Sequence, residues 1–355
     1  AKQLAGELAA RLPAQRHAAI RDELQGMSVA TFLIKTIPNE MLYDRTRITV
    51  EAGKLTSIVF ENDDTMMHNL VITEPGGLSE VGKAAEAMAA QPGGFERGFI
   101  PESDRILWAM KLLQPGEAAT LSFETPQQPG VYPFVCTYPG HWRRMFGAMH
   151  VVADLKAYEA DPAAYAARHP PNIQDELLSD DRQRTVWSFE ELEPSLASLA
   201  HGRSFLRAQR VFQFANCVAC HQLDGKGHAV GPDLTKLDPN WSSSDVLREL
   251  LEPSKRINEK FQTYSFLLDS GKTVNGLIVE ETETHVKVLE NPLARQKPTL
   301  LEKAEIEFRK KSVISMMPQG LLDRLTADEI LDLIAYVLAR GDRQSELFQG
   351  GHHHH

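Results

Sequence analysis

The sequence has only three cysteines in 355 residues and no long apolar run. Its hydrophobic stretches fall far short of the roughly 20 residues that a membrane-spanning helix needs, so we expect no transmembrane segment. Basic residues are outnumbered, with 38 Lys and Arg against 48 Asp and Glu, and the net charge of −10 argues against nucleic acid as a partner. The length and the apolar fraction of 42% allow two or three soluble domains with real cores.

The two ends of the chain are assigned no chemistry. Residues 1–27 carry a helical repeat of leucines, which predicts an N-terminal helical segment that covers the next domain or ends a missing one. No signal peptide is visible and the chain opens in a helical pattern, so we expect a mature protein or an excised part of a longer one. Residues 350–355, Gly-Gly-His-His-His-His, are typical of an expression-tag remnant.

All three cysteines fall in motifs for a metal or haem, which leaves none for a disulfide. Cys217-Val-Ala-Cys220-His221 has the spacing for covalent attachment of a c-type haem. Cys217 and Cys220 would form the thioethers, and His221 would be the proximal iron ligand. Gly231-Pro-Asp-Leu follows, and the carbonyl of Pro232 can orient the imidazole. Because such haem is attached outside the bacterial cytoplasm, the motif predicts a periplasmic or exported protein.

The sixth haem ligand should be a methionine on a loop before the last helix. Ser315-Met-Met-Pro-Gln-Gly occupies that place. Met317 is the expected ligand, and Met316 is the alternative as a packing residue. Between the haem motif and this loop, residues 261–311 have the pattern of strands. We therefore predict a mostly α domain over residues 201–345 with a small β insertion, which either packs near the haem or docks a partner; we favour packing.

A second cluster lies within one short loop. Cys136 supplies a thiolate, His141 an imidazole and Met145 a thioether, which together suit a blue-copper site with a weak axial methionine. The second imidazole is expected from His68, which follows a predicted strand. Its neighbour Asn69 is expected to bridge this segment to the Cys136 loop by hydrogen bonds.

The residues around this cluster alternate in the manner of β strands. Strands are expected at 47–51, 55–60 and 119–123, separated by turn residues. An Ala- and Gly-rich stretch at 76–98 predicts a short helix with loops. Residues 28–153 should therefore form an all-β Greek-key sandwich with one helical excursion.

Residues 28–152 resemble the azurin and plastocyanin family of cupredoxins, closest to azurin. The likeness rests on Ile48-Thr-Val50, Met67-His-Asn69, the Lys111–Phe123 hairpin and Cys136-Thr-Tyr-Pro-Gly-His141 with Met145. It implies a mononuclear electron-transfer copper bound by His68, Cys136, His141 and Met145. The family's extra backbone contact falls on Met67, where azurin-like proteins have Gly, and the two cysteines of the usual family disulfide are absent.

Residues 201–341 resemble the planctomycete-type haem-binding domain, a relative of class I cytochrome c. The shared features are the Cys217–His221 motif, Gly231-Pro-Asp-Leu, the strands around Asp269-Ser-Gly and the loop from Ser315. The resemblance implies electron transfer and no known substrate.

Residues 154–200 form an acidic linker between the two predicted domains. Ten acidic and four basic residues give this stretch more than half of the net charge. Such a composition predicts a solvated spacer with short helices. It leaves open whether the two metal sites touch or act as separate carriers.

The two sites together predict an electron-transfer protein that passes single electrons between a type 1 copper and a haem c, with redox proteins as donor and acceptor and no catalytic residue. Both sites would be coordinatively filled, which leaves no open position for a substrate. One alternative is a redox enzyme such as a copper nitrite reductase, and another is an electron-transfer module of a larger dehydrogenase. The first needs a second copper, yet the unassigned native histidines show no ligand spacing: His17, His150, His169, His201, His228 and His285.

The copper loop also carries an aromatic residue and two basic residues after its histidine. His141, next to Trp142, is expected to present the exit edge for the electron at the surface. Arg143 and Arg144 are expected to dock against an acidic surface, either the linker or an external partner.

Overall fold

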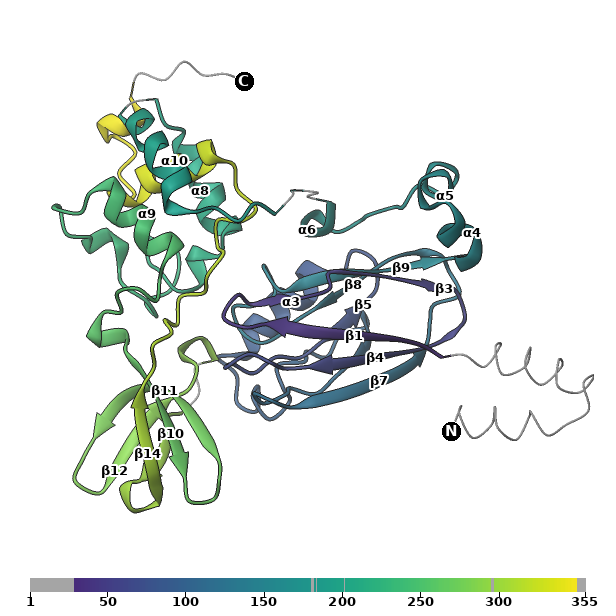
Figure 1. Ribbon diagram of the computed structural model, residues 1–355, viewed down its shortest axis with the longest axis horizontal. Coiled ribbons are helices and arrows are strands. Elements are labelled where there is room, and N and C mark those ends of the chain that lie inside the picture. The colour runs from purple at the N-terminus through teal and green to yellow at the C-terminus, as the bar shows by residue number, and fades with distance from the viewer. Residues whose placement is uncertain (1–28, 180–181, 183, 201, 295–296, 350–355) are drawn as a thin grey trace, which may run out of the picture.

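A computed structural model describes residues 29–179, 182, 184–200, 202–294 and 297–349. The expected helix over residues 1–27 and the tag at 350–355 lie outside these residues. Figure 1 shows a β sandwich beside a helical unit, with a small separate sheet extending from the helical unit. None of the helices in that part of the chain is long and apolar enough to cross a membrane.

The first body is a sandwich of two sheets, which confirms the fold expected for residues 28–153. The strands at 30–37, 47–51 and 118–124 alternate more and less buried residues, as a sheet with one face in a core requires, whereas those at 71–73, 130–135 and 146–152 are buried almost throughout. The strands are β1 (Ala30–Ile37), β2 (Leu42–Tyr43), β3 (Arg47–Glu51), β4 (Leu55–Glu61), β5 (Val71–Thr73), β6 (Ile106–Ala109), β7 (Ala118–Glu124), β8 (Gly130–Val135) and β9 (Phe146–Val152). One sheet has the order β2-β1-β4-β7 and the other β3-β9-β8-β5-β6. The pairs β1–β4 and β3–β9 are parallel.

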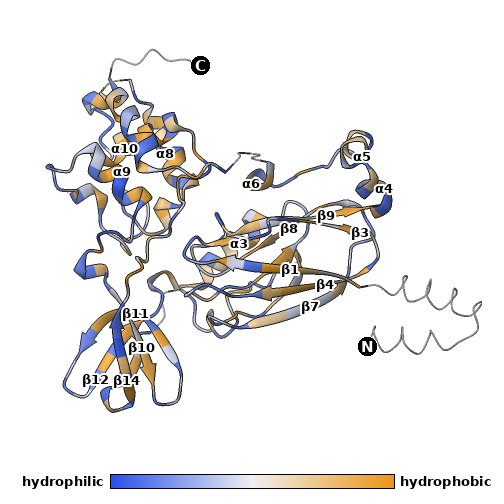
Figure 2. Ribbon diagram, viewed as in Figure 1, coloured by the Kyte–Doolittle hydropathy of each residue, from blue (hydrophilic) through white to orange (hydrophobic). Residues whose placement is uncertain are grey.

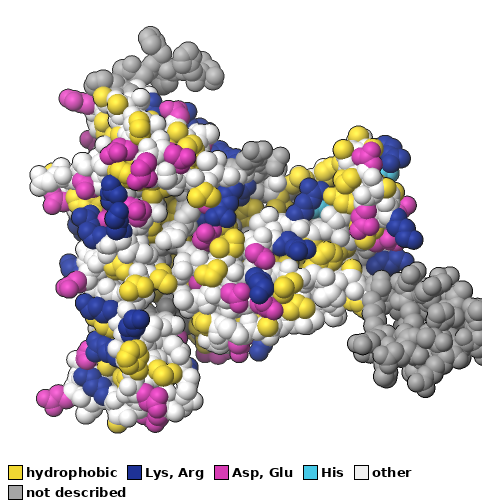
Figure 3. Space-filling view, viewed as in Figure 1, with side chains coloured by type: hydrophobic (Ala, Val, Ile, Leu, Met, Phe, Trp, Pro, Cys, Tyr) yellow, Lys and Arg dark blue, Asp and Glu magenta, His cyan; other side chains and the backbone are white. Residues whose placement is uncertain are grey.

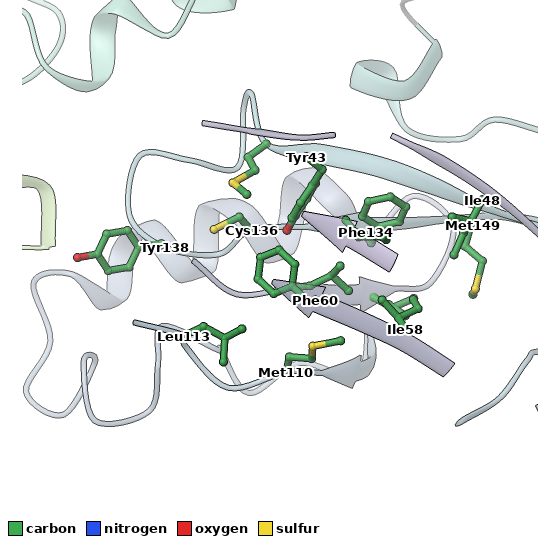
Figure 4. Close-up of a cluster of buried hydrophobic side chains, with 14 of the residues drawn as sticks. Tyr43, Ile48, Ile58, Phe60, Met110, Leu113, Phe134, Cys136, Tyr138 and Met149 are labelled. Atoms are coloured by element: carbon green, nitrogen blue, oxygen red, sulfur yellow. The ribbon is translucent and has the colours of Figure 1, made fainter. Parts of the chain in front are cut away.

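Aromatic side chains fill the space between the two sheets. Tyr43 contacts Phe60 and Phe134, with ring centroids 5.7 and 5.4 Å apart. The Tyr43 hydroxyl donates to the carbonyl of Asn69 at 2.7 Å, which satisfies its polar end inside the core. Figure 4 shows that this cluster extends to Cys136, so the thiolate of the copper loop is anchored in the core of the sandwich.

Helix α3 (Leu78–Met88) is the predicted helical excursion, and it packs beside the copper loop. Gly82 allows this contact, because a Cβ there would lie 2.4 Å from the Trp142 ring. The linker caps the helix: the Asp175 carboxylate accepts from the backbone of Gly76 at 2.8 Å and of Leu78 at 3.0 Å. A carboxylate at a helix N-terminus satisfies free N–H groups and stabilises the helix dipole.

The linker does contain short helices, but it is packed along both bodies. Tyr165 accepts a hydrogen bond from the backbone of Ala153 at 3.1 Å at the edge of the sandwich. At the other end, Leu192 and Leu199 join the core of the helical unit. The elements are α4 (Leu155–Ala160), α5 (Pro162–Arg168), α6 (Glu176–Ser179), α7 (Phe189–Leu192) and the 3-10 helix η1 (Glu193–Leu199). The charged composition therefore does not produce a free spacer.

The helical unit is built on two helices that cross in its core. Phe212 and Tyr336 meet there with ring centroids 5.7 Å apart. The capping box that Thr326 predicts is present, and Gly341, at φ 80°, follows the end of the last helix. Figure 2 shows hydrophobic and hydrophilic residues alternating along these helices, as amphipathic packing requires. The elements are α8 (Phe205–Phe214), η2 (Cys217–Ala219), η3 (Leu234–Lys236), α9 (Ser243–Leu251), α10 (Ala327–Leu338) and η7 (Glu346–Phe348).

The predicted β insertion is an antiparallel sheet with its own small core. Its strands are β10 (Thr263–Leu268), β11 (Thr273–Glu281), β12 (His285–Leu289), β13 (Thr299–Glu302) and β14 (Ile306–Lys311), with short turns η4 (Glu259–Phe261), η5 (Pro292–Ala294) and η6 (Lys303–Glu305). The order is β13-β12-β11-β10-β14. All five strands lie within residues 261–311, where the sequence pattern predicts strands. The loop after β12 reaches the sandwich, where Ala294 joins its core.

Candidate metal centres

Three ligand groups meet at one buried point of the sandwich. The Sγ atom of Cys136 lies 3.8 Å from Nδ1 of His68 and 3.6 Å from Nδ1 of His141. The two Nδ1 atoms are 3.2 Å apart. Metal bonds of about 2.0–2.3 Å to nitrogen and sulfur would separate such ligands by about 3–4 Å. The donor set and its spacing therefore fit a trigonal copper of the blue type.

The loop that carries these groups is closed by its own backbone. The amide of Cys136 donates to the carbonyl of Met145 at 2.9 Å, and the amide of Met145 donates to the carbonyl of His141 at 2.8 Å. Gly140 makes the reversal at φ 84°, a left-handed conformation that favours glycine. Met145 is fully buried in the same core cluster as Cys136. Its role as the axial ligand remains a prediction.

Asn69 ties the His68 segment to the copper loop, as its position predicts. Its Nδ2 donates to the hydroxyl of Thr137 at 2.7 Å, and the backbone amide of Thr137 donates to its Oδ1 at 2.8 Å. A third bond runs from Nδ2 to the carbonyl of Gly98 at 3.0 Å. All of these groups are inside the protein, so they fix the relative position of the two ligand segments before a metal binds.

Asp64 is a buried partner of the candidate copper ligand His68, and sequence reasoning missed it. Its Oδ2 lies 3.1 Å from Nε2 of His68, and both side chains are inaccessible to solvent. The other oxygen accepts from the backbone of Asn39 at 3.1 Å. A carboxylate on the far nitrogen of a metal-binding histidine fixes the ring and raises its basicity. A carboxylate four residues before the predicted ligand His68 was the signal in the sequence that could have indicated this contact.

The surroundings of the two imidazoles shift their pKa values in opposite directions. Burial acts to lower the pKa of His68, but hydrogen bonds with Asp64 and Cys136 outweigh it and raise that pKa to about 9. Burial and the neighbouring His68 lower the pKa of His141 well below its usual range. The metal-free pair therefore holds its proton on His68, and binding of a metal at this site releases it.

The haem motif follows α8 directly and presents its groups around one turn. The carbonyl of Pro232 lies 2.9 Å from Nδ1 of His221, which leaves Nε2 for iron. Gly231 lies against the ring, and a Cβ there would be 2.9 Å from it. Cys217 and Cys220 are unpaired thiols, and burial raises their pKa to about 12 and about 11. Two free thiols beside an oriented imidazole fit a covalently attached haem.

The two candidate methionines of the sixth position lie in different surroundings. Met317 packs against the core of the helical unit, and its amide donates to the hydroxyl of Ser315 at 3.1 Å. Met316 instead lines a hollow between the β insertion and the sandwich. This placement favours Met317 as the ligand, which remains a prediction.

Comparisons with known proteins place a family on each of these two sites. Residues 30–152 match the family model of copper binding proteins, plastocyanin/azurin family, and residues 205–265 match that of cytochrome c. The chain joins a plastocyanin/azurin-family copper domain to a cytochrome c domain. Its cofactors are copper and haem c, as the sequence predicts. Below, the copper domain is residues 30–152, and the cytochrome domain is the helical unit with its β insertion.

The copper domain is similar to auracyanins and azurin. Auracyanin-A from Chloroflexus aurantiacus is 29% identical over 128 residues, which cover 36% of this chain and 76% of that protein. Azurin from Pseudomonas fluorescens biotype C is 32% identical over 89 residues, 24% of this chain and 66% of azurin. A crystal structure of dithionite-reduced auracyanin from Roseiflexus castenholzii is 32% identical with a TM-score of 0.31, and the match covers 35% of this chain and 98% of that structure.

The copper loop is packed against the cytochrome domain. Nδ2 of Asn216, the residue before the first haem cysteine, donates to the carbonyl of Gly140 at 2.7 Å. Arg144 donates to the carbonyls of Gln319 at 3.2 Å and Gly320 at 2.8 Å, in the loop of the candidate sixth ligand. The residues on both sides of this contact therefore adjoin the expected metal ligands.

This packing corrects one expectation, because His141, a candidate copper ligand, is not at the surface. Its side chain is 1% exposed, and Trp142 is 5% exposed. Leu293, from the loop of the β insertion, lies against Gly140, where a Cβ would approach it to 2.5 Å. The β insertion thus packs on the copper loop, whereas the sequence suggested packing at the haem edge.

Within the described residues, the contacts of the two arginines are with groups outside the linker. Arg143 forms an ion pair with Glu86 of α3 at 2.9 Å and stacks on Trp142, with 4.2 Å from guanidinium carbon to ring centroid. Arg144 also donates to the backbone of Glu40 at 2.9 Å. Figure 3 shows acidic and basic side chains interspersed on the face in view.

The other described histidines are not part of the candidate copper cluster, and two further methionines of the copper domain are packing residues. Among the described residues, the ligand group found is that of His68, Cys136 and His141. Met149 is fully buried in the sandwich core, and the sulfur of Met67 accepts from Gln114 at 3.1 Å. His17 and His201 lie outside the described part of the chain.

Proposed function

We propose that this chain is an electron-transfer protein in which a type 1 copper and a haem c exchange single electrons within one molecule. The observation that carries the proposal is the direct contact between the loop of the copper ligands and the haem-attachment segment, where Asn216 is bonded to Gly140. The membership of the two domains in electron-carrier families supports the same reading.

The residues of the copper site would hold the metal in a shell closed to water. His68, Cys136, His141 and Met145 would surround the copper, and all four side chains are buried. His221 and Met317 would hold the haem iron. When bound, each cofactor cycles between oxidation states that differ by one electron. Ligands that are already positioned change little between the two states, which suits transfer without bond making.

The closed arrangement also determines where an outside carrier can approach. The edge of the copper site at Gly140 and His141 is covered by the chain's own cytochrome domain. We therefore infer that electrons enter or leave the copper through the haem, and that external donors or acceptors meet the cytochrome domain. These partners are redox proteins, and the covalent haem motif favours a periplasmic or exported location.

A redox titration with optical detection tests the proposal. The purified protein should take up two electrons per chain in two one-electron steps, one that bleaches a thiolate-to-copper band and one that changes the haem bands. His68→Ala should remove the copper step and leave the haem step. If the thiolate band survives in that variant, the copper assignment is wrong.

A copper enzyme with a cytochrome tail needs a second, open copper site. The structure gives it no support within the residues described, because His150, His169, His228 and His285 lie outside the one ligand cluster found there. Copper analysis above one ion per chain, or turnover of nitrite, would favour this alternative over the proposed function.

A further inference from the structure

The contact between the two domains contains three hydrogen-bonded connections between the candidate copper ligands and the segments that would hold the haem. One runs from His141 to the adjoining Gly140 carbonyl and across one bond of 2.7 Å to Asn216, which adjoins Cys217. It is covalent everywhere except at that single bond. A hollow of about 510 Å³ lies beside it, lined by Pro139, Gly140 and residues 228–230. Beside this hollow, the side-chain amide of Asn216 is the direct link between the two domains.

The second connection is longer and weaker. It leaves His68 through Asp64 at 3.1 Å, continues from Asp64 to the amide of Asn39 at 3.1 Å, and crosses from the Asn39 carbonyl to the amide of Gln319 at 3.0 Å. Three hydrogen bonds separate it from the loop of Met317. A third connection crosses by one bond of 2.8 Å from Arg144, next to Met145, to the carbonyl of Gly320, but it runs along the whole arginine side chain and then along the backbone to Met317. Since each non-covalent gap and each added covalent bond weakens electronic coupling, the connection through Asn216 dominates.

The local structure indicates that Asn216 is present for its side chain. Its backbone has φ 62°, a left-handed conformation in which Gly is the least strained residue and Asn the next best. Gly would suit this turn but has no amide to donate. The side chain is 6% exposed, and its Oδ1 has no hydrogen-bond partner, so the bond to Gly140 is what orients it.

We propose that the side-chain amide of Asn216 is the coupling element through which the electron crosses between the copper and haem sites. This rests on the proposed function. One electron moves: Cu(I) is oxidised to Cu(II) as Fe(III) is reduced to Fe(II), or the reverse, and no bond breaks and no proton is transferred. Asn216 is a positioning residue, since it touches neither metal.

Two substitutions test the amide with little strain. Asn216→Gly keeps the left-handed turn and removes the side chain, and Asn216→Asp keeps the shape and removes the donor. Asn39→Gly is the matched control, because Asn39 also has a left-handed φ of 64° at this interface but bonds to Gln319 through its backbone. Small-angle scattering reports for each variant whether the two domains remain packed together.

The first readout uses the reduced, copper- and haem-loaded protein with isotope-labelled asparagine. The Asn216 side-chain amide hydrogens should exchange with solvent at least about tenfold more slowly than those of an exposed asparagine. Exchange at the exposed rate would overturn the proposal, because the bond to Gly140 would then not persist in solution.

The second readout is the rate of internal electron transfer in the copper- and haem-loaded protein. Both Asn216 variants should be slower several-fold, with unchanged scattering and unchanged potentials, whereas Asn39→Gly keeps the wild-type rate. Wild-type rates in the Asn216 variants would overturn the coupling role and leave the proposed function standing. Slow rates that accompany separated domains would also overturn it, since the amide would then act as a clamp. Absence of internal transfer in the wild type would remove both proposals.

Discussion

Replacing Arg144 with methionine should release the copper domain from the cytochrome domain. Arg144 donates to the carbonyls of Gln319 and Gly320 across the domain boundary, and to that of Glu40 within the copper domain. Methionine keeps the length of the side chain but can donate to none of these oxygens. The three carbonyls would lose their partner, while the folding of each domain would not depend on it.

The size of the effect follows from the two bonds that cross the boundary. Hydrogen bonds from a charged donor contribute about 1.5–3 kcal/mol each, or about 3–6 kcal/mol for the pair. Arg144 is only partly buried, so water can bond to the same groups once the domains separate, which offsets part of this free energy. A net contribution of about 2–3 kcal/mol remains. The docking equilibrium should then shift by about 30- to 140-fold toward separated domains.

Small-angle scattering of the metal-free protein measures this shift directly, because separation increases the radius of gyration. Arg143→Met is the matched control: Arg143 is the adjacent residue, but its ion pair is with Glu86 inside the copper domain. It should leave the scattering unchanged. If Arg144→Met also scatters as the wild type does, the guanidinium does not hold the domains together and the reasoning fails.

Three further changes test single sites. Asp64→Asn should lower copper affinity by about 10–100-fold and raise the copper potential, because the carboxylate on His68 is lost; metal titration and voltammetry would show neither change if Asp64 were only structural. Met317→Ala should open the haem to added imidazole while Met316→Ala does not, and the reverse result would exchange the assignments. Burial, reinforced by Arg47, lowers the pKa of His150 to about 4. Below about pH 6.5 the unfolded chain therefore binds a proton at His150, whereas the folded protein keeps this imidazole neutral down to about pH 4. Stability should therefore fall by about 1–2 kcal/mol, after allowance for partial exposure, as the pH drops through that window, and His150→Gln should flatten this slope in urea unfolding; an unchanged slope would refute the cause.

The two metal sites could be predicted because most of their candidate ligands are close in sequence, whereas His68 and Met317 lie far from the rest and were assigned by family resemblance and by their place before or after an element. Cys136, His141 and Met145 share one loop, and Cys217 to His221 is a single turn, so spacing alone predicts them. Strands β3, β4 and β7 were predictable for the same reason, since alternation is local. Strands β8 and β9 show the limit, because they are buried on both faces and do not alternate.

The arrangement of the domains could not be predicted, because it depends on contacts between distant residues. The bond from Asn216 to Gly140 joins positions 76 apart. Asp175 sits in an acidic stretch, where composition predicts solvation, yet it is buried as the cap of α3. Composition describes the average of a segment, whereas a single carboxylate such as that of Asp175 is enough to hold the linker against α3. Burial of His141 by the cytochrome domain was missed for this reason.

The measurement that most directly tests the central claim is the rate at which the copper and haem sites re-equilibrate after rapid reduction of one of them. In the fully loaded protein, the account predicts a first-order phase whose rate is independent of protein concentration, because the two sites are packed together within one chain. A rate proportional to protein concentration would contradict it, since the two sites would then be separate carriers that meet only between molecules.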